Sequence, residues 1–298
     1  MATWGVSLSK LDKLRELLRS YGSCVVAYSG GVDSVFLARV AHDVLGAKSL
    51  AVIADTPSLP RRELQEALEL AARFGIPVRV VRTAEFANAE YVANPLNRCY
   101  FCKHELFTEL APLARAEGFA VIAYGENASD IGDFRPGAQA AAEFAVRAPL
   151  KEAGLTKQEI RECSAQLGLP TADKPQMACL SSRVPYGETV TPAKLRMIED
   201  AEYVLRDLGF HDVRVRHHEL GSKFPVPSSK LGEPAAGVLA HLARIEVGPA
   251  EMSNLLLDGN TVKVAEALKK IGYAHVTLDL QGYRRGSGNE AIPLALRH

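Results

Sequence analysis

The six residues SGGVDS, from Ser29 to Ser34, combine two adjacent glycines with two hydroxyls and one carboxylate. Glycine lets a ligand come close to backbone N–H groups, and a helix N-terminus favours negative charge. The pattern predicts an anion site, most simply for phosphate. Its candidate residues are Ser29, Gly30, Gly31, Asp33 and Ser34. The alternative is a plain glycine turn, and no Gly-Lys-Ser/Thr follows as in the lysine-bearing phosphate loop.

Three cysteines form a second group of residues that could do chemistry. Cys99 and Cys102 have C-x-x-C spacing in NRCYFCK, and Cys179 lies in ACLSSR. If the fold brings them together, three thiolates could hold three corners of a 4Fe–4S cluster and leave one iron open. With His104 they could instead form a four-ligand zinc site. The C-x-x-C pair alone could be a redox dithiol.

Alternating strand and helix patterns must position these residues. Apolar runs of strand length occur at 24–29, 49–55, 77–83 and 119–125, and helical patterns occur at 34–46, 61–75, 102–118 and 156–168. Apolar runs of this length, separated by helices, predict an α/β fold with a parallel sheet flanked by helices. Ligands of such sheets bind at the carboxyl ends of the strands, beside helix N-termini. SGGVDS stands at such a place.

The end of the run at 119–125 offers further candidates for the same edge of the sheet. Gly125, Asn127 and Asp130 lie in YGENASD. We predict that they contact a nucleotide or magnesium, with a simple loop cap as the alternative for Asn127 and Asp130.

The pattern changes after CLSSRVPYGETVT. A helix at 192–208, strands at 211–217, 239–247 and 275–280, and a helix at 252–271 predict a smaller C-terminal α+β domain. A Gly-, Pro- and Ser-rich insertion at 219–237 is expected to be a surface loop or flap. A boundary near Pro185 gives two predicted domains, 1–185 and 186–298.

Composition limits the class of protein. The chain has 298 residues, with 35 basic and 35 acidic side chains. Zero net charge argues against a broad nucleic-acid surface. No segment is apolar enough to span a membrane, and the N-terminus lacks a signal-peptide pattern. We therefore expect a cytoplasmic protein whose cysteines are thiols. Cys24, in an apolar strand, and Cys163, in a helix, are expected to be inert and buried.

SGGVDS resembles the signature of the ATP pyrophosphatases, also called PP-loop enzymes, which split ATP into AMP and pyrophosphate. The resemblance implies an adenine nucleotide alpha hydrolase-like fold, with Asp33 linked to Mg²⁺. Further stretches resemble the LarE family, whose sulfur-inserting enzymes mature the nickel-pincer cofactor of lactate racemase. These stretches are NPLNRCYFCK, YGENASDIGDFRPG, APLKEAGLTKQEIR, DKPQMACLSSRVPYG and GYRRGSGNE.

That resemblance implies a reaction. ATP adenylates a carboxylate of pyridinium-3,5-biscarboxylic acid mononucleotide, and a sulfur nucleophile displaces AMP to leave a thiocarboxylate. In sacrificial members the cysteine matching Cys179 gives up its own sulfur, whereas members with a cysteine triplet use a 4Fe–4S cluster. The cluster version is expected here, on Cys99, Cys102 and Cys179. The resemblance also implies a homo-oligomer and hand-over of the product to a nickel-inserting enzyme.

A phosphate and two carboxylates need cationic, planar donors. The residues expected to bind the substrate are Ser182, Arg183, Arg214, Arg216, Arg284 and Arg285. Glu202 resembles a family acidic position near the reactive cysteine and is a catalytic candidate together with Cys179 and Asp33. Solvated surface charges are the alternative for the arginines, and a plain surface glutamate for Glu202.

Three other functions remain open at this stage. A tRNA-thiolating enzyme could use the same cysteines, although the neutral charge and the lack of zinc-ribbon cysteine pairs count against it. An amide-forming synthetase would not need Cys179 beside a C-x-x-C pair. A regulatory module would bind ATP or AMP without releasing pyrophosphate.

Overall fold

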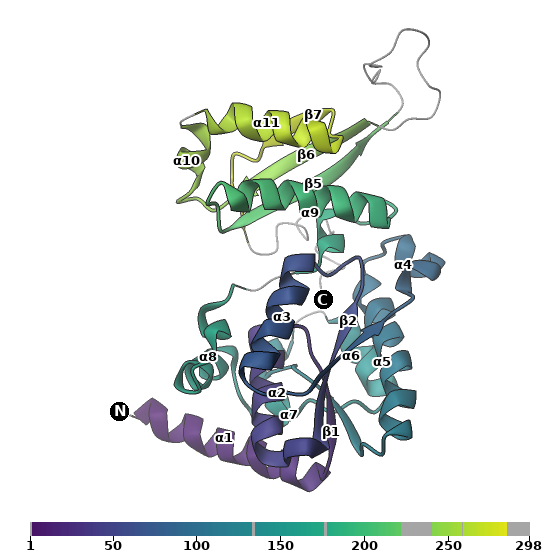
Figure 1. Cartoon of the computed structure of the whole chain (residues 1–298), viewed down its shortest axis with the longest axis vertical. Helices are drawn as coiled ribbons and strands as arrows, with labels where there is room; N and C mark the ends of the chain where they lie inside the picture. The colour runs from purple at the N-terminus through teal and green to yellow at the C-terminus, as the bar shows by residue number, and fades with distance from the viewer. Residues whose placement is uncertain (1, 133–134, 176–177, 222–239, 258, 285–298) are drawn as a thin grey trace. The chain divides into compact units, whose positions relative to one another are not determined.

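The computed structural model describes residues 2–132, 135–175, 178–221, 240–257 and 259–284, with side chains from residue 9 onward (Figure 1). These residues form two compact units. Among the described residues, the first unit comprises those within 2–91 and 96–178, and the second comprises 92–95 and those from 179 to 284.

A parallel sheet forms the centre of the first unit. Its strands are β1 (Cys24–Ala27), β2 (Ser49–Asp55), β3 (Val78–Arg82) and β4 (Val121–Tyr124), in the order β3-β2-β1-β4. Cys24 pairs with Ser49 on one side and Val121 on the other, both in parallel. The predicted α/β fold with a parallel sheet is confirmed. Because all four strands run the same way, the loops after them share one edge of the sheet.

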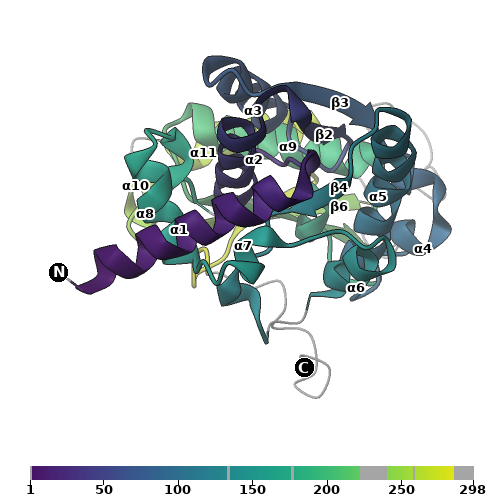
Figure 2. The same cartoon turned by 90° about the horizontal axis from the view of Figure 1, so that it is seen from below.

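Helices cover both faces of this sheet (Figures 1 and 2). One core joins α1 (Ala2–Tyr21), α2 (Val32–Leu45), α3 (Arg61–Arg73) and α8 (Lys157–Gln166) to Val26, Ala51 and Ile53 of the strands. A second core joins α5 (Arg98–Ala116) to Val25, Leu50 and Val52. Neighbouring strand residues point to opposite faces. Both sets are therefore buried, which explains the unbroken apolar runs in the sequence.

Short elements complete the first unit and its links. They are η1 (Gly46–Lys48), η2 (Glu85–Ala87), α4 (Ala89–Val92), η3 (Ala128–Asp130), α6 (Pro136–Glu143), α7 (Pro149–Glu152) and η4 (Pro170–Asp173). The buried thiols predicted for Cys24 and Cys163 are confirmed, with exposed fractions of 0% and 1%. Burial raises the pKa of Cys24 to about 12, so this thiol stays protonated.

The second unit is a smaller α+β layer. Strands β5 (Val213–Leu220) and β6 (Ala240–Val247) are antiparallel, and β7 (His275–Leu278) adds in parallel beside β6. Helices α9 (Pro192–Asp207) and α11 (Asn260–Ile271) pack on one face of this sheet through an apolar core. The 3₁₀ turn η5 (Leu180–Arg183) precedes α9, and α10 (Met252–Leu256) precedes α11.

Several predicted boundaries were wrong. The single helix expected at 252–271 is two helices, because Gly259 adopts a left-handed backbone with φ of 69° at the start of α11. The helix expected from 102 begins at Arg98, so the whole C-x-x-C pair lies on α5. The strand expected at 211–217 runs from Val213 to Leu220. From residue 222 on, the predicted surface loop at 219–237 lies outside the described residues.

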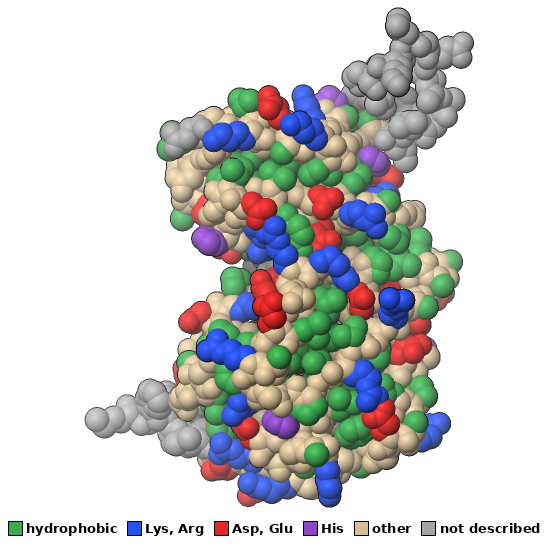
Figure 3. Space-filling view, viewed as in Figure 1, with side chains coloured by type: hydrophobic (Ala, Val, Ile, Leu, Met, Phe, Trp, Pro, Cys, Tyr) green, Lys and Arg blue, Asp and Glu red, His purple; other side chains and the backbone are tan. Residues whose placement is uncertain are grey.

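Surface composition agrees with a neutral protein. On the face drawn in Figure 3, blue and red side chains are interspersed on each unit. Among the described residues, the structure contains no helix with the length and apolar character needed to cross a bilayer.

A buried histidine in the second unit makes stability depend on pH. His217 is 0% exposed, and its Nδ1 lies 3.1 Å from the Tyr273 hydroxyl. Burial, together with the neighbouring His241 and Lys194, lowers the pKa of His217 from 6.5 to about 3. The unfolded chain therefore binds this proton at a higher pH than the folded chain does.

We expect the free energy of unfolding to fall as pH drops from 6.5 toward 3, by up to about 1.4 kcal/mol per pH unit from this group. His218 and His241, whose pKa burial also lowers, act in the same direction. Urea unfolding across this range should show a shallower pH slope for His217→Leu than for the wild type. The exposed His275→Leu is the control. Equal slopes for all three proteins would contradict the assignment.

Candidate active site

The glycine turn connects the end of β1 to the start of α2, at the carboxyl edge of the sheet. Gly31 is the N-cap of α2, and it has no side chain that could cap the helix. The first-turn amides are thus left for a ligand. The Ser34 hydroxyl accepts from the Ser29 N–H at 3.1 Å and donates to the Gly31 carbonyl at 3.1 Å. These bonds hold the loop in a fixed shape.

Gly30 is required in this loop for two reasons. Its φ of 72° is in the left-handed region, and a Cβ there would lie 2.7 Å from the Cβ of Ala67 on α3. At Gly125 a Cβ would be in tight contact with the same helix, at 3.0 Å from the Ser34 nitrogen and 3.1 Å from the Asp33 Cβ. The end of β4 therefore packs directly on the first turn of α2.

Asp33 is already engaged by two side chains of the first unit. The Lys157 ammonium lies 2.5 Å from its carboxylate, and the Asn127 amide donates to it at 3.3 Å. Lys157 is the first residue of α8, which begins with a capping box formed by Thr156 and Glu159. The carboxylate that could bind a divalent cation thus lies beside a lysine that could bind a phosphate oxygen.

The cap expected as the alternative for Asn127 and Asp130 is present. Asn127 accepts from the Ser129 N–H, and its own N–H donates to Asp130, which forms a capping box on η3. Asp130 also pairs with Arg135. The Asn127 side-chain amide also donates to Asp33. Asn127 therefore caps η3 and lies beside the glycine loop at the same time.

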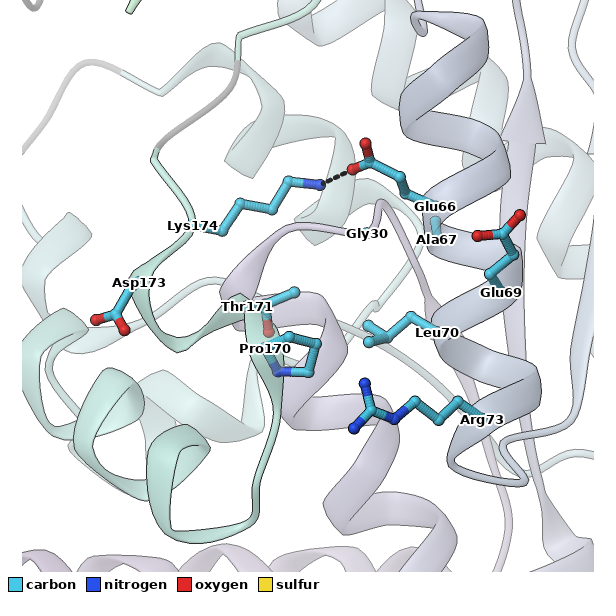
Figure 4. A pocket seen from close by; sticks show the side chains of 10 residues that line it. All are labelled: Gly30, Glu66, Ala67, Glu69, Leu70, Arg73, Pro170, Thr171, Asp173 and Lys174. Atoms are coloured by element: carbon cyan, nitrogen blue, oxygen red, sulfur yellow. Dashed lines mark hydrogen bonds and ion pairs between the residues drawn. The ribbon is translucent and has the colours of Figure 1, made fainter. Parts of the chain in front are cut away.

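A pocket of about 580 Å³ lies beside Gly30, between α3 and the segment from Pro170 to Lys174 (Figure 4). Its volume is in the range of small-molecule sites. Lys174 crosses toward α3 and forms ion pairs with Glu63 at 2.5 Å and Glu66 at 3.3 Å. The residues that line the pocket are Gly30, Glu66, Ala67, Glu69, Leu70, Arg73, Pro170, Thr171, Asp173 and Lys174.

Cys99 and Cys102 are both in the first turns of α5, also in the first unit. Residues three apart share one side of a helix, and here Cys99 is exposed and Cys102 is half-buried. The Lys103 ammonium lies 4.4 Å from the Tyr124 ring centre, and burial lowers its pKa. A Cβ at Gly137 would lie 2.6 Å from Lys103 Cδ, so Gly137 makes room for this lysine.

Cys179 belongs to the second unit. It is exposed and caps the turn η5. Its carbonyl accepts from the Ser182 N–H at 3.0 Å and from Arg183 Nη1 at 3.0 Å. Arg183 Nη1 also donates to the Ser182 hydroxyl at 3.0 Å. The backbone that carries the Cys179 thiol is therefore fixed by Arg183.

Arg183 and Glu202 form a buried, two-point ion pair. Arg183 Nε and Nη2 donate to the two carboxylate oxygens at 2.8 and 3.1 Å, and the Val215 N–H donates to the same carboxylate at 3.1 Å. Burial alone would raise the pKa of Glu202, but Arg183 outweighs it, so that pKa is lowered. Glu202 stays ionised and holds Arg183 in place.

The arginines of β5 are buried, with exposed fractions of 5% for Arg214 and 8% for Arg216. They are therefore not the solvated surface charges considered as the alternative. Arg216 donates to both oxygens of Glu246 at 3.0 Å, and to the Ser182 carbonyl at 2.8 Å. Burial, followed by the charge of Arg183, lowers the pKa of Arg214.

Arg284 is half-buried at the end of the described chain, and Arg285 lies outside the described residues. Sequence reasoning missed three charged residues of these clusters, namely Lys157, Lys103 and Glu246. Lys157 is in the first turn of the helical pattern predicted at 156–168, and Lys103 follows Cys102, so both positions carried a local signal. Glu246 carried none.

Two units thus carry separate parts of the predicted site. The first holds the glycine loop, Asp33 and the C-x-x-C pair, and the second holds Cys179 and the arginine cluster. None of the five cysteines forms a disulfide. Within the described part of the chain, no three His, Cys, Asp or Glu side chains are grouped as metal ligands.

Comparison with known proteins identifies relatives. A family model described as NAD synthase matches residues 9–95, which include the glycine loop. An uncharacterized protein of Synechocystis sp. is 42% identical over 95% of this chain and 98% of its own length. The pyridinium-3,5-bisthiocarboxylic acid mononucleotide synthase of Lactiplantibacillus plantarum is 31% identical over 96% of both chains. The tRNA-specific 2-thiouridylase MnmA of Azorhizobium caulinodans is 30% identical over 76% of this chain and 69% of its own length.

Proposed function

Because the chain belongs to the LarE family of ATP-dependent sulfur transferases, we propose that it converts carboxylates of pyridinium-3,5-biscarboxylic acid mononucleotide into thiocarboxylates. The residues of 1–185 would activate the substrate with ATP, and those of 186–298 would bind it and form contacts between copies of the chain. The product would pass to a nickel-inserting enzyme.

Activation is the task of the glycine loop. A substrate carboxylate oxygen attacks the α-phosphorus of ATP, the bond to the bridging oxygen breaks, and pyrophosphate leaves. The amides from Gly30 to Ser34 and the dipole of α2 would hold the pyrophosphate. Asp33 offers the carboxylate oxygen that Mg²⁺ prefers. Lys157 would then exchange its contact with Asp33 for a phosphate oxygen.

Sulfur transfer completes the reaction. A sulfur nucleophile attacks the acyl carbon, the bond from carbon to the AMP oxygen breaks, and AMP leaves with that oxygen. An acyl phosphate permits this step because it supplies a leaving group that a free carboxylate lacks. No oxidant or reductant is consumed. The exposed Cys179, on a turn fixed by Arg183, is the residue that we assign to sulfur delivery.

The source of the sulfur is a finer part of the proposal. Two thiols on one side of the first turns of α5 suit a metal cluster, and Cys179 would be the third ligand. A 4Fe–4S cluster on three thiolates would present hydrosulfide at its open iron. The alternative is sacrifice of Cys179, in which elimination leaves dehydroalanine and the sulfur stays on the product.

One observation carries the proposal, namely the exposed Cys179 on a backbone held by a buried Arg183–Glu202 pair in a chain with a glycine loop for ATP. Incubation with ATP and the dicarboxylated mononucleotide should yield AMP, pyrophosphate and a product heavier by an oxygen-to-sulfur exchange. Turnover with tRNA instead would reject the proposal in favour of thiolation of RNA.

Anaerobic purification decides the sulfur source. The cluster version predicts a brown protein whose colour is lost in Cys99→Ala and kept in Cys163→Ala. A colourless protein with tightly bound zinc would refute the cluster. Mass spectrometry of Cys179 after turnover separates the remaining routes, because an intact thiol means a renewable source and dehydroalanine means sacrifice.

Lys157 gives a separate prediction for the activation step. Lys157→Met removes the charge next to Asp33, and we expect the rate of AMP formation to fall about 100-fold. Lys10→Met is a matched control, because Lys10 pairs with Glu159 of the same helix at 2.7 Å and is similarly exposed, at 27% against 29%. Equal rates of AMP formation for the two variants would show that Lys157 takes no part in the activation step.

A further inference from the structure

The side chain of Lys174 ties the segment from Pro170 to Lys174 to helix α3. Its ammonium lies 2.5 Å from a carboxylate oxygen of Glu63 and 3.3 Å from one of Glu66, the contact drawn as a dashed line in Figure 4. The side chains of Lys174 and Glu63 are only 19% and 14% exposed. Partly buried ion pairs are screened less by water and salt than exposed ones, so this contact holds the segment on α3.

A second contact comes from α8 and binds the backbone of the same segment. Arg161 donates from its two terminal nitrogens to the carbonyls of Ala172 and Lys174, the latter at 2.8 Å. The segment also closes on itself, because the Lys174 N–H donates to the Thr171 carbonyl at 3.1 Å. Lys174 is therefore held through both its side chain and its backbone, by two helices of the first unit.

This anchored segment lies near the glycine loop in space and near the sulfur residue in sequence. Gly30 and Lys174 line the same pocket, and a Cβ at Gly30 would contact Ala67 of α3. Cys179 follows Lys174 by five positions. Since five residues span at most about 18 Å when fully extended, the anchor limits how far Cys179 can lie from Lys174.

From these contacts we infer that Lys174 is a positioning residue for sulfur delivery, which anchors the chain leading to Cys179 on the unit that carries the glycine loop. The inference rests on the proposed function for the reaction that Cys179 serves. Water competes with sulfur for the acyl adenylate, because hydrolysis releases AMP and returns the carboxylate. A sulfur centre kept nearby at a high effective concentration reacts before water does.

The first test measures the anchor without turnover. One nitroxide label is placed on the exposed Cys179 and another on Lys48→Cys, at an exposed position of the first unit. Cys99→Ser and Cys102→Ser in the same chain leave only buried cysteines besides these two. Pulsed electron paramagnetic resonance then gives the distribution of distances between the labels. We expect Lys174→Met to broaden this distribution, and an unchanged distribution would overturn the inference.

Matched variants separate the anchor from a general loss of stability. Lys174→Arg keeps the charge beside α3 and should keep the narrow distribution. Lys10→Met should keep it too, because Lys10 pairs with Glu159 at 2.7 Å, outside the segment from Pro170 to Lys174. Removal of the partners by Glu63→Gln with Glu66→Gln should broaden it as Lys174→Met does, and all three changes together should do no more.

The second test counts the AMP released for each thiocarboxylate formed. The wild type should release about one AMP per thiocarboxylate, whereas in Lys174→Met we expect this ratio to rise about tenfold, because water reaches the adenylate first. A variant that only lowered the folded fraction would reduce both products together and leave the ratio unchanged. Lys174→Arg should restore the ratio. An unchanged ratio in Lys174→Met would overturn the role in sulfur delivery.

Failure of the two proposals can be told apart. Thiocarboxylate formation in the wild type, with an equal ratio in Lys174→Met, would leave the proposed reaction standing and reject the role of Lys174. If the wild type releases AMP and pyrophosphate but forms no thiocarboxylate, the proposed reaction is rejected. The distance distributions then decide alone whether Lys174 anchors Cys179.

Discussion

Replacement of Cys179 by alanine is expected to abolish thiocarboxylate formation, by about 1,000-fold or more, while adenylation persists. The reason is that adenylation and sulfur transfer use residues of different units. The glycine loop, Asp33 and Lys157 lie in one compact unit, and Cys179 lies in the other. Removal of the sulfur leaves every group around the loop in place. The measurement is exchange of labelled pyrophosphate into ATP, alongside mass spectrometry of the mononucleotide.

The matched control is Cys163→Ala. Cys163 lies on α8, is 1% exposed and belongs to the apolar core of the first unit. This variant should lose some stability through the small cavity and keep both activities. Retained sulfur insertion in Cys179→Ala would transfer the sulfur role to other cysteines. Loss of pyrophosphate exchange in the same variant would mean that Cys179 supports the fold rather than the sulfur step.

The second large effect is expected from Gly30→Ala. An alanine in the left-handed region costs about 1–2 kcal/mol, and its Cβ would meet the Cβ of Ala67 at 2.7 Å. Either the loop or α3 must move, so the amides at the start of α2 lose their alignment. Since a misplacement of about 1 Å can cost about 100-fold in rate, we expect pyrophosphate exchange to fall by at least that factor.

Two variants separate the contact from the backbone strain. Gly22→Ala introduces alanine at the same φ of 72°, with no heavy atom within 4 Å of its Cβ. It should lose stability and keep activity. Ala67→Gly in the Gly30→Ala background removes the colliding methyl group and should restore part of the exchange rate. Full activity of Gly30→Ala alone would contradict a loop that must hold its present shape.

The sequence predicted the first unit well because its signals are local. Unbroken apolar runs in β1 and β2 reflect strands buried on both faces by helices. The glycine loop is likewise one continuous stretch. The start of α5 could not be placed, because Arg98 and Cys99 carry no helix signal of their own and Asn97 makes no capping bond.

The remaining parts of the candidate site depend on contacts between distant residues. Lys157 reaches Asp33 across 124 positions, and no local pattern encodes that pairing. The burial of Arg216 is explained by Glu246, which lies on a neighbouring strand 30 positions away. From sequence alone, charged residues on a strand are expected to lie at the surface. In the structure these residues form ion pairs and are shielded from water.

Transfer of a heavy-oxygen label from the substrate carboxylates to AMP tests the central claim most directly. If the carboxylate attacks ATP and sulfur then displaces AMP, each thiocarboxylate formed should leave one labelled oxygen on the phosphate of AMP and none on pyrophosphate. Cys179→Ala should give no release of labelled AMP through sulfur attack. Thiocarboxylate formed together with unlabelled AMP would contradict activation by adenylation, and with it the role assigned here to the glycine loop.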